Sequence, residues 1–118
     1  MQYLLLIYDA EKTWATMSEA ERNKIFAEYG AFTSDIKASG HHRGGDALQP
    51  THTATTVRVR DGKTSTTDGP FAETREQLGG YMLIDVKDLD EAIAIAARIP
   101  LARTSTVEVR PVREGPPR

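Results

Sequence analysis

The sequence contains no cysteine, a single tryptophan and only three histidines among its 118 residues. Without cysteine, the chain cannot form disulfides, use a thiolate nucleophile or build a cysteine-based zinc site. His41 and His42 are neighbours, and adjacent side chains on an extended strand point to opposite faces. They cannot readily share one metal with His52, and no phosphate-binding loop or dinucleotide fingerprint is present. The sequence therefore predicts no metal site and no cofactor.

The chain also lacks an excess of basic residues and a long hydrophobic run. Its formal net charge is -2, which gives no electrostatic reason to expect binding to nucleic acid. The N-terminal apolar run, Tyr3 to Tyr8, has no basic segment before it and is followed directly by Asp9. A membrane span needs about 20 apolar residues, so this run predicts a strand, with no signal peptide and no membrane segment. Cytoplasmic localisation is the default expectation.

The length is that of one domain, which we expect over residues 1–112 with a flexible tail at 113–118. Two helices are predicted. Ser18 with Glu21 three residues later forms a capping box, and apolar positions at helical spacing continue to Gly40, so a helix is expected over 18–39. Asp88 and Glu91 repeat this pattern, and Pro100 marks the end of the second helix.

The remaining segments predict strands. The run 3–8 is continuously apolar and is typical of a strand buried on both faces, 81–86 predicts a second buried strand, and 106–112 alternates. Segment 41–50 predicts at most a short strand. Val57 and Val59 alternate with arginines before Asp61-Gly62, which is a hairpin turn that places Val59 opposite Thr64.

The order of elements indicates an α+β fold, namely a ferredoxin-like split βαβ with an inserted β-hairpin. Two helices on one face leave the other face of the sheet bare. We therefore expect a homodimer in which two sheets pack face to face.

The segment 66–86, "TTDGPFAETREQLGGYMLIDV", gathers the residues best suited to chemistry. A carboxylate such as Asp68, held by the Gly69-Pro70 turn against apolar walls, would have a raised pKa and could act as a general base. The alternative is structural, since Asp before such a turn often caps it and the charged residues nearby suit a solvated surface. Gly79-Gly80 indicates either close approach of a ligand or a β-bulge. Tyr29 lies on the inward face of the first helix, and Trp14 is expected in the loop before it.

The motifs "DGPFAET" and "EQLGGY", together with "LLIYDAEKTW", resemble the DGPF-domain branch of the YCII-related family over about residues 1–112. The resemblance implies a ferredoxin-like domain of the dimeric α+β barrel group. The family positions that match this chain are Asp68, Gly69, Pro70, Phe71, Glu73, Glu76, Gly79, Gly80 and Tyr81, whereas Arg75 stands where relatives often have Lys.

The resemblance implies less about the activity of this chain than about its fold. In the wider family a His on the first helix and an Asp near the sheet are proposed as a catalytic pair, and one member is a dechlorinating enzyme acting on a hydroxylated aromatic. Tyr29 stands where that branch has its His, and a tyrosine with a pKa near 10 cannot shuttle protons at neutral pH as imidazole does. DGPF members are also often encoded beside, or fused to, extracytoplasmic-function sigma factors, which implies a regulatory protein partner.

The sequence thus predicts a pocket between the sheet and the first helix that binds a small organic ligand and is edged by the DGPF loop. The expected chemistry is proton transfer of the lyase or isomerase type, with Asp68 and Tyr29 as catalytic residues. The expected ligand-binding residues are Trp14, Pro70, Phe71, Glu73, Arg75, Gly80 and Tyr81. Two alternatives remain open: a non-catalytic regulatory or sensor module linked to sigma-factor-dependent transcription, and a purely structural dimerisation domain.

Overall fold

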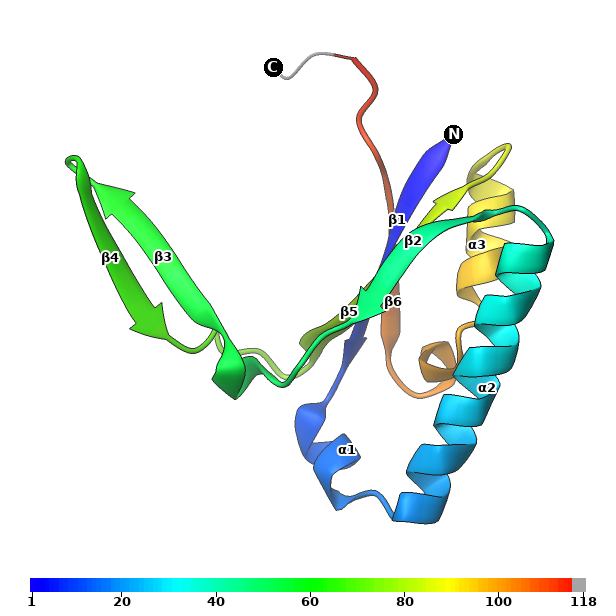
Figure 1. Cartoon of the computed structure of the whole chain (residues 1–118), viewed down its shortest axis with the longest axis horizontal. Helices are drawn as coiled ribbons and strands as arrows, with labels where there is room; N and C mark the ends of the chain where they lie inside the picture. The colour runs from blue at the N-terminus through cyan, green and yellow to red at the C-terminus, as the bar shows by residue number, and fades with distance from the viewer. Residues whose placement is uncertain (116–118) are drawn as a thin grey trace.

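The computed structural model describes residues 1–115, so the predicted tail at 113–118 lies partly outside the described residues. Its centre is an antiparallel four-stranded sheet with the strand order β2-β5-β1-β6. The strands are β1 (Gln2–Asp9), β2 (His42–Ala47), β5 (Gln77–Asp85) and β6 (Thr106–Pro111). Two helices, α2 (Glu19–Ala38) and α3 (Leu89–Ala96), lie on the same side of this sheet (Figure 1). This arrangement confirms the ferredoxin-like α+β fold.

Both predicted helix starts are confirmed by their caps. The Ser18 hydroxyl accepts a hydrogen bond from the Glu21 backbone N–H at 3.2 Å, and the Asp88 carboxylate accepts one from the Glu91 N–H at 2.9 Å. Each cap satisfies a backbone donor that the first helical turn leaves unpaired. The sequence therefore places both helices against the sheet at well-defined starting points.

Strand β1 departs from its prediction because only one of its faces is buried in the single chain. Tyr3, Leu5 and Ile7 face the helices and are buried, whereas Leu4 and Leu6 on the outer face are half-buried. The expectation that β1 is buried on both faces was wrong for the single chain, since no layer within residues 1–115 covers the outer face of the sheet. We call this surface the outer face.

Two further elements differ from the sequence-based expectation. A short helix, α1 (Glu11–Thr16), replaces the loop expected around Trp14; at six residues it is too short to show an apolar period, and its N-cap residue makes no side-chain bond. Strand β5 begins at Gln77, because backbone pairing continues through the double glycine. Ile7 pairs with Gly80 and Tyr8 with Leu78, so Gly79 forms a β-bulge.

The predicted hairpin is confirmed as β3 (Thr55–Arg60) and β4 (Lys63–Asp68), with Val59 opposite Thr64. Asp61 and Gly62 both have positive φ, 52° and 75°, as a two-residue turn of this kind requires. The hairpin forms a separate two-stranded sheet and extends away from the rest of the chain (Figure 1). We call residues 55–68 the β3–β4 arm. None of the helices within residues 1–115 has the length and apolar character needed to cross a membrane.

Candidate functional site

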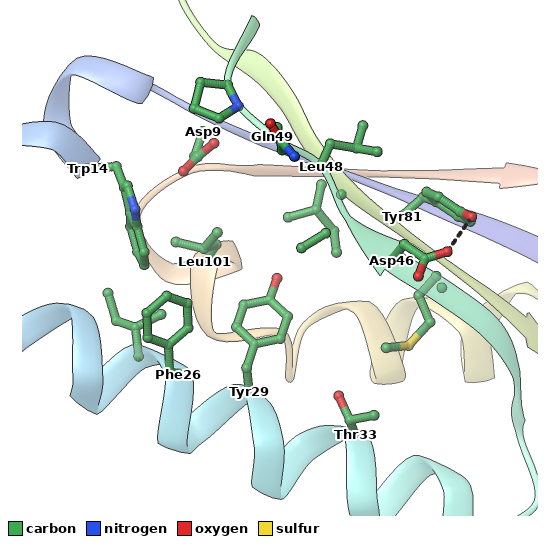
Figure 2. Close-up of a pocket in the computed structure, with 18 of the residues that line it drawn as sticks. Asp9, Trp14, Phe26, Tyr29, Thr33, Asp46, Leu48, Gln49, Tyr81 and Leu101 are labelled. Atoms are coloured by element: carbon green, nitrogen blue, oxygen red, sulfur yellow. Dashed lines mark hydrogen bonds between the residues drawn. The ribbon is translucent and has the colours of Figure 1, made fainter. Parts of the chain in front are cut away.

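A cavity of about 540 Å³ lies between the sheet and the N-terminal half of α2. Ile7, Gly80 and Met82 line it from the sheet, while Ile25 and Phe26 line it from α2. Trp14 of α1 and Leu101 of the short 3₁₀ helix η2 (Pro100–Arg103) extend the apolar wall (Figure 2). A volume of this size, lined mainly by apolar side chains with a few polar groups, suits a small organic ligand.

The cavity exists because α2 packs on the sheet at only one end. Phe32 and Ile36, in the C-terminal half of the helix, are buried in the core. In the N-terminal half, Phe26 is 59% exposed and its ring meets the edge of Trp14 at a centroid distance of 5.4 Å. Helix α1 therefore provides a side wall at the end where α2 does not pack on the sheet.

Tyr29 is a polar group on the helical side of the cavity. Its hydroxyl points from α2 into the cavity (Figure 2). Burial, and secondarily the negative charge of Asp9, raise the pKa of Tyr29 to about 12. At neutral pH this hydroxyl is therefore protonated and serves as a hydrogen-bond donor.

Asp9 is the carboxylate on the opposite side, at the last position of β1. Burial raises the pKa of Asp9 above its ordinary value, and the charges of Glu11 and Glu76 raise it further. The bulge residue Gly79 leaves room for this side chain, because a Cβ there would lie 2.9 Å from the Asp9 Oδ1 atom. The β-bulge of the double glycine thus positions a candidate acid–base group.

The other two carboxylates of the cavity are already engaged. The Glu11 oxygens accept hydrogen bonds from the Thr51 backbone N–H at 2.7 Å and from its hydroxyl at 2.8 Å. Asp46 accepts a hydrogen bond from the Tyr81 hydroxyl at 2.8 Å. Asp9 is therefore the carboxylate best placed to act on a ligand. None of the residues that line the cavity, all within 1–115, is a lysine or arginine.

A smaller cavity of about 180 Å³ adjoins the first and shares Asp9, Trp14 and Leu101 with it. Arg75 and Glu76 also line this second cavity. The Glu76 Oε1 atom is buried and has no hydrogen-bond partner within residues 1–115. Asp9 thus lies between two cavities and close to a second acidic side chain.

The sequence-predicted site residues fall into two groups. Trp14, Tyr29, Gly80 and Tyr81 line the main cavity, and Arg75 lines the smaller one. The predicted residues Asp68, Pro70, Phe71 and Glu73 line neither cavity, are exposed and lie at the base of the β3–β4 arm and in the loop after it. Backbone bonds of Gly69 hold this loop, with its N–H donating to the Ala54 carbonyl at 2.7 Å and its carbonyl accepting from the Thr56 hydroxyl at 2.8 Å.

Sequence reasoning did not select Asp9 or Phe26. In the sequence, Asp9 is distinguished only as the acidic residue that ends an apolar run, and no local motif marks it as a site residue. Phe26 carried no separate signal, since its exposure depends on how α2 leans. Within residues 1–115, no three His, Asp or Glu side chains converge in a geometry that could hold a metal ion.

The fold and cavity define a ferredoxin-like α+β protein with a ligand-sized apolar pocket. The chain belongs to the YCII-related domain family, which matches residues 1–115. It is 38% identical over 114 residues to an uncharacterized protein of Rhizobium meliloti (strain 1021), covering 95% of this chain and 92% of that protein.

Among solved structures, the chain is similar to 5-chloro-2-hydroxyhydroquinone dehydrochlorinase from Burkholderia phenoliruptrix AC1100 in complex with 2,5-dihydroxybenzoquinone. The TM-score is 0.55 at 15% sequence identity, and the match covers 98% of this chain and 96% of that one. At this identity, the likeness establishes the shared fold.

Proposed function

We propose that the main cavity binds a small hydroxylated organic molecule and that Asp9 and Tyr29 contact its polar groups. The observation that carries this proposal is the pairing of a partly buried carboxylate and a protonated phenol across one apolar cavity. Apolar walls hold a ring by burial, while a donor and an acceptor fix its orientation. The structural neighbour, whose name describes an enzyme acting on a hydroxylated ring, supports this ligand class.

The chemistry proposed for this pair is proton transfer of the lyase or isomerase type. The Asp9 carboxylate accepts a proton from a ligand hydroxyl or acidic carbon, which its raised pKa favours. The Tyr29 hydroxyl donates a hydrogen bond to the ligand oxygen on which negative charge develops. In this proposal Asp9 has the general-base role that we predicted for Asp68, because Asp68 is exposed outside the cavity.

The YCII-related fold further leads us to propose a homodimer of the dimeric α+β barrel type. Leu4, Leu6 and Leu83 give the outer face an apolar surface that is only half-buried in the single chain. Packing two such faces together removes that surface from water. Sedimentation analysis at micromolar concentration tests this, and a monomer there contradicts the proposed dimer.

A ligand titration tests the proposed cavity directly. Trp14 is the only tryptophan in the chain and lines the cavity, so its fluorescence reports occupancy. Hydroquinone is a suitable probe because it is a ring with two hydroxyls and no charge. We expect saturable quenching, with affinity lowered about 3-fold to 10-fold in Tyr29→Phe and in Asp9→Asn, the size of one lost hydrogen bond.

Matched controls distinguish this assignment from the one based on sequence. Asp68→Asn makes the same chemical change as Asp9→Asn but outside the cavity, and Tyr8→Phe removes a phenol hydroxyl that lies 3.4 Å from the Glu108 Oε1 atom. Both controls should bind hydroquinone as the natural chain does. If Asp68→Asn lost binding and Asp9→Asn still bound hydroquinone as the natural chain does, the choice of Asp9 would be overturned. Non-saturable quenching in every variant would remove the cavity as a binding site.

Ligand sensing without turnover is the second candidate function, and the state of Tyr29 favours it. A phenol whose pKa lies at about 12 donates a hydrogen bond but does not cycle protons at neutral pH. The sigma-factor-linked regulatory role would then use the same cavity to change contacts with a protein partner. Native mass spectrometry that finds a co-purifying molecule, followed by an assay for its chemical conversion, distinguishes sensing from catalysis.

A further inference from the structure

The β3–β4 arm has no core of its own. Val57 and Val59 lie on the same face of the hairpin and are 58% and 56% exposed. An isolated two-stranded hairpin is marginally stable in water, and its exposed edges and apolar side chains favour pairing with another surface. Within residues 1–115, the arm pairs with no strand of the main sheet. Its valine face therefore suits a contact with another molecule.

The dimensions of the chain support the same conclusion. The radius of gyration is 16.4 Å, compared with about 13.5 Å for a compact domain of this length. The chain is also flat, with extents of 47 × 44 × 19 Å. In Figure 1 the arm diverges on the side of the sheet opposite to α2 and α3, which is the side of the outer face. A partner packed on the outer face would therefore lie within reach of the arm.

The cavity mouth of a second copy has the matching chemistry. Phe26 and Leu48 are large apolar side chains exposed at the cavity, and Asp46, two residues before Leu48, adds a carboxylate to its lining. The arm offers the two valines together with Arg58, Arg60 and Lys63, and these three cations form no ion pair within residues 1–115. These cations lie on the face of the hairpin opposite to the valines, so their long stems must pass the edge of the ribbon for their charges to approach Asp46 while the valine face packs on apolar surface. The two surfaces are thus complementary in hydrophobicity, and the positive charge of the arm is opposite in sign to that of Asp46.

We propose that the β3–β4 arm of one copy packs across the cavity mouth of a second copy of this chain. The inference rests on the proposed homodimer, and it adds that each cavity is completed by its partner. A strand of six residues spans about 20 Å, enough to cross an interface and reach the far layer of the partner. The DGPF loop, with Phe71 81% exposed, then has the role of fixing the base of the arm that closes the partner's cavity.

Cysteine crosslinking tests the position of the arm, because the natural chain contains no cysteine. Val57→Cys marks the arm, and Asn23→Cys marks α2 one turn before Phe26 at an exposed position. Lys37→Cys, exposed at the other end of α2, is the matched control. Each α2 variant is co-expressed with Val57→Cys under a different tag and treated with a short bismaleimide. We expect a mixed crosslinked dimer with Asn23→Cys and little or none with Lys37→Cys.

Sedimentation of the same untreated samples separates failure of the arm from failure of the dimer. A dimer that does not crosslink through Asn23→Cys, or that crosslinks equally through Lys37→Cys, overturns the arm proposal and leaves the dimer intact. A monomer overturns both, while hydroquinone binding by that monomer would still support the cavity. Crosslinking of Val57→Cys with itself in place of Asn23→Cys would show that the arms meet each other, which also overturns the proposal.

A second variant measures the contribution of the valine face. Val57→Asp combined with Val59→Asp should raise the dimer dissociation constant about tenfold or more, because both charges would be buried against an apolar surface. Ser65→Asp places one charge on the opposite face of the same hairpin and should change the constant much less. Equal dissociation constants for the natural chain and the double variant would contradict docking through the valine face.

Discussion

The two halves of α2 have different environments although they belong to one uninterrupted helix. Its C-terminal half places Phe32 and Ile36 in the core, where Ile36 is fully buried. Its N-terminal half presents Ile25 and Phe26 to a cavity of about 540 Å³, and Tyr29 lines the same cavity from the middle of the helix. Apolar spacing along a helix therefore identifies the face that turns toward the sheet but does not show whether that face packs on it. Stability and binding should consequently respond to changes in different halves.

The largest effect is expected from truncating the packed half. Ile36→Ala should lower the free energy of unfolding by about 2–5 kcal/mol, the range for deleting a fully buried aliphatic side chain. Ile25→Ala makes the same change in the open half, where the residue is half-buried, and should cost about 1 kcal/mol or less. Urea denaturation of both variants measures the difference. Equal losses would mean that the two halves pack alike.

A second effect concerns the wall that faces the open half. Gly45 in β2 lines the cavity, and a Cβ there would lie 2.6 Å from the Tyr81 carbonyl oxygen of β5. Gly45→Ala should therefore cost about 1–3 kcal/mol through displacement of the edge strand. Gly44→Ala, where a Cβ meets nothing within 4 Å, is the matched control and should change stability by less than about 1 kcal/mol. Thermal unfolding of the pair tests whether β2 is held this closely.

The elements visible in the sequence are those with local signals. Ser18, Asp88 and the Asp61-Gly62 turn each fix the backbone within a few residues, and the structure confirms the helices and hairpin that they predict. Helix α1 left no such signal. The burial of β1 on one face only could not be predicted either. An apolar run indicates that its side chains avoid water, but it does not indicate which layer covers each face.

Part of the candidate site could also be predicted from the sequence. Four of the predicted residues line the main cavity: Trp14 from α1, Tyr29 from α2, and Gly80 and Tyr81 from β5. The DGPF motif led to the prediction of Asp68 as the catalytic carboxylate. In the structure Asp9 lines the cavity instead, and it lies beside the bulge at Gly79. That juxtaposition depends on the pairing of β1 with β5, which joins residues about seventy positions apart and cannot be read from local pattern.

Asp9, which lies across the cavity from the open half of α2, should lower the stability of the folded chain at neutral pH. Its folded-state pKa is raised by burial and neighbouring carboxylates, so its contribution is most favourable below pH 3.8 and is lost as pH rises through the folded-state pKa. Asp9→Asn should therefore be more stable than the natural chain at pH 7, with the gain disappearing in acid. Asp68→Asn, which changes an exposed carboxylate outside both cavities, is the matched control and should change stability by no more than about 0.5 kcal/mol. Urea denaturation across pH measures this, and a destabilised Asp9→Asn would contradict it.

The smallest effect is expected at Tyr29. Tyr29→Phe keeps the ring and should change stability by no more than about 0.5 kcal/mol at pH 7. Because the folded-state pKa of Tyr29 is raised from 10.0 to about 12, the natural chain favours the protonated phenol and loses that stability as pH rises through this interval. The variant should lack this part of the alkaline decline, so the difference between the two chains isolates the contribution of Tyr29. Identical alkaline profiles would mean that the Tyr29 hydroxyl is solvated, and the cavity wall formed by α2 would then lack the buried donor on which the proposed ligand contact depends.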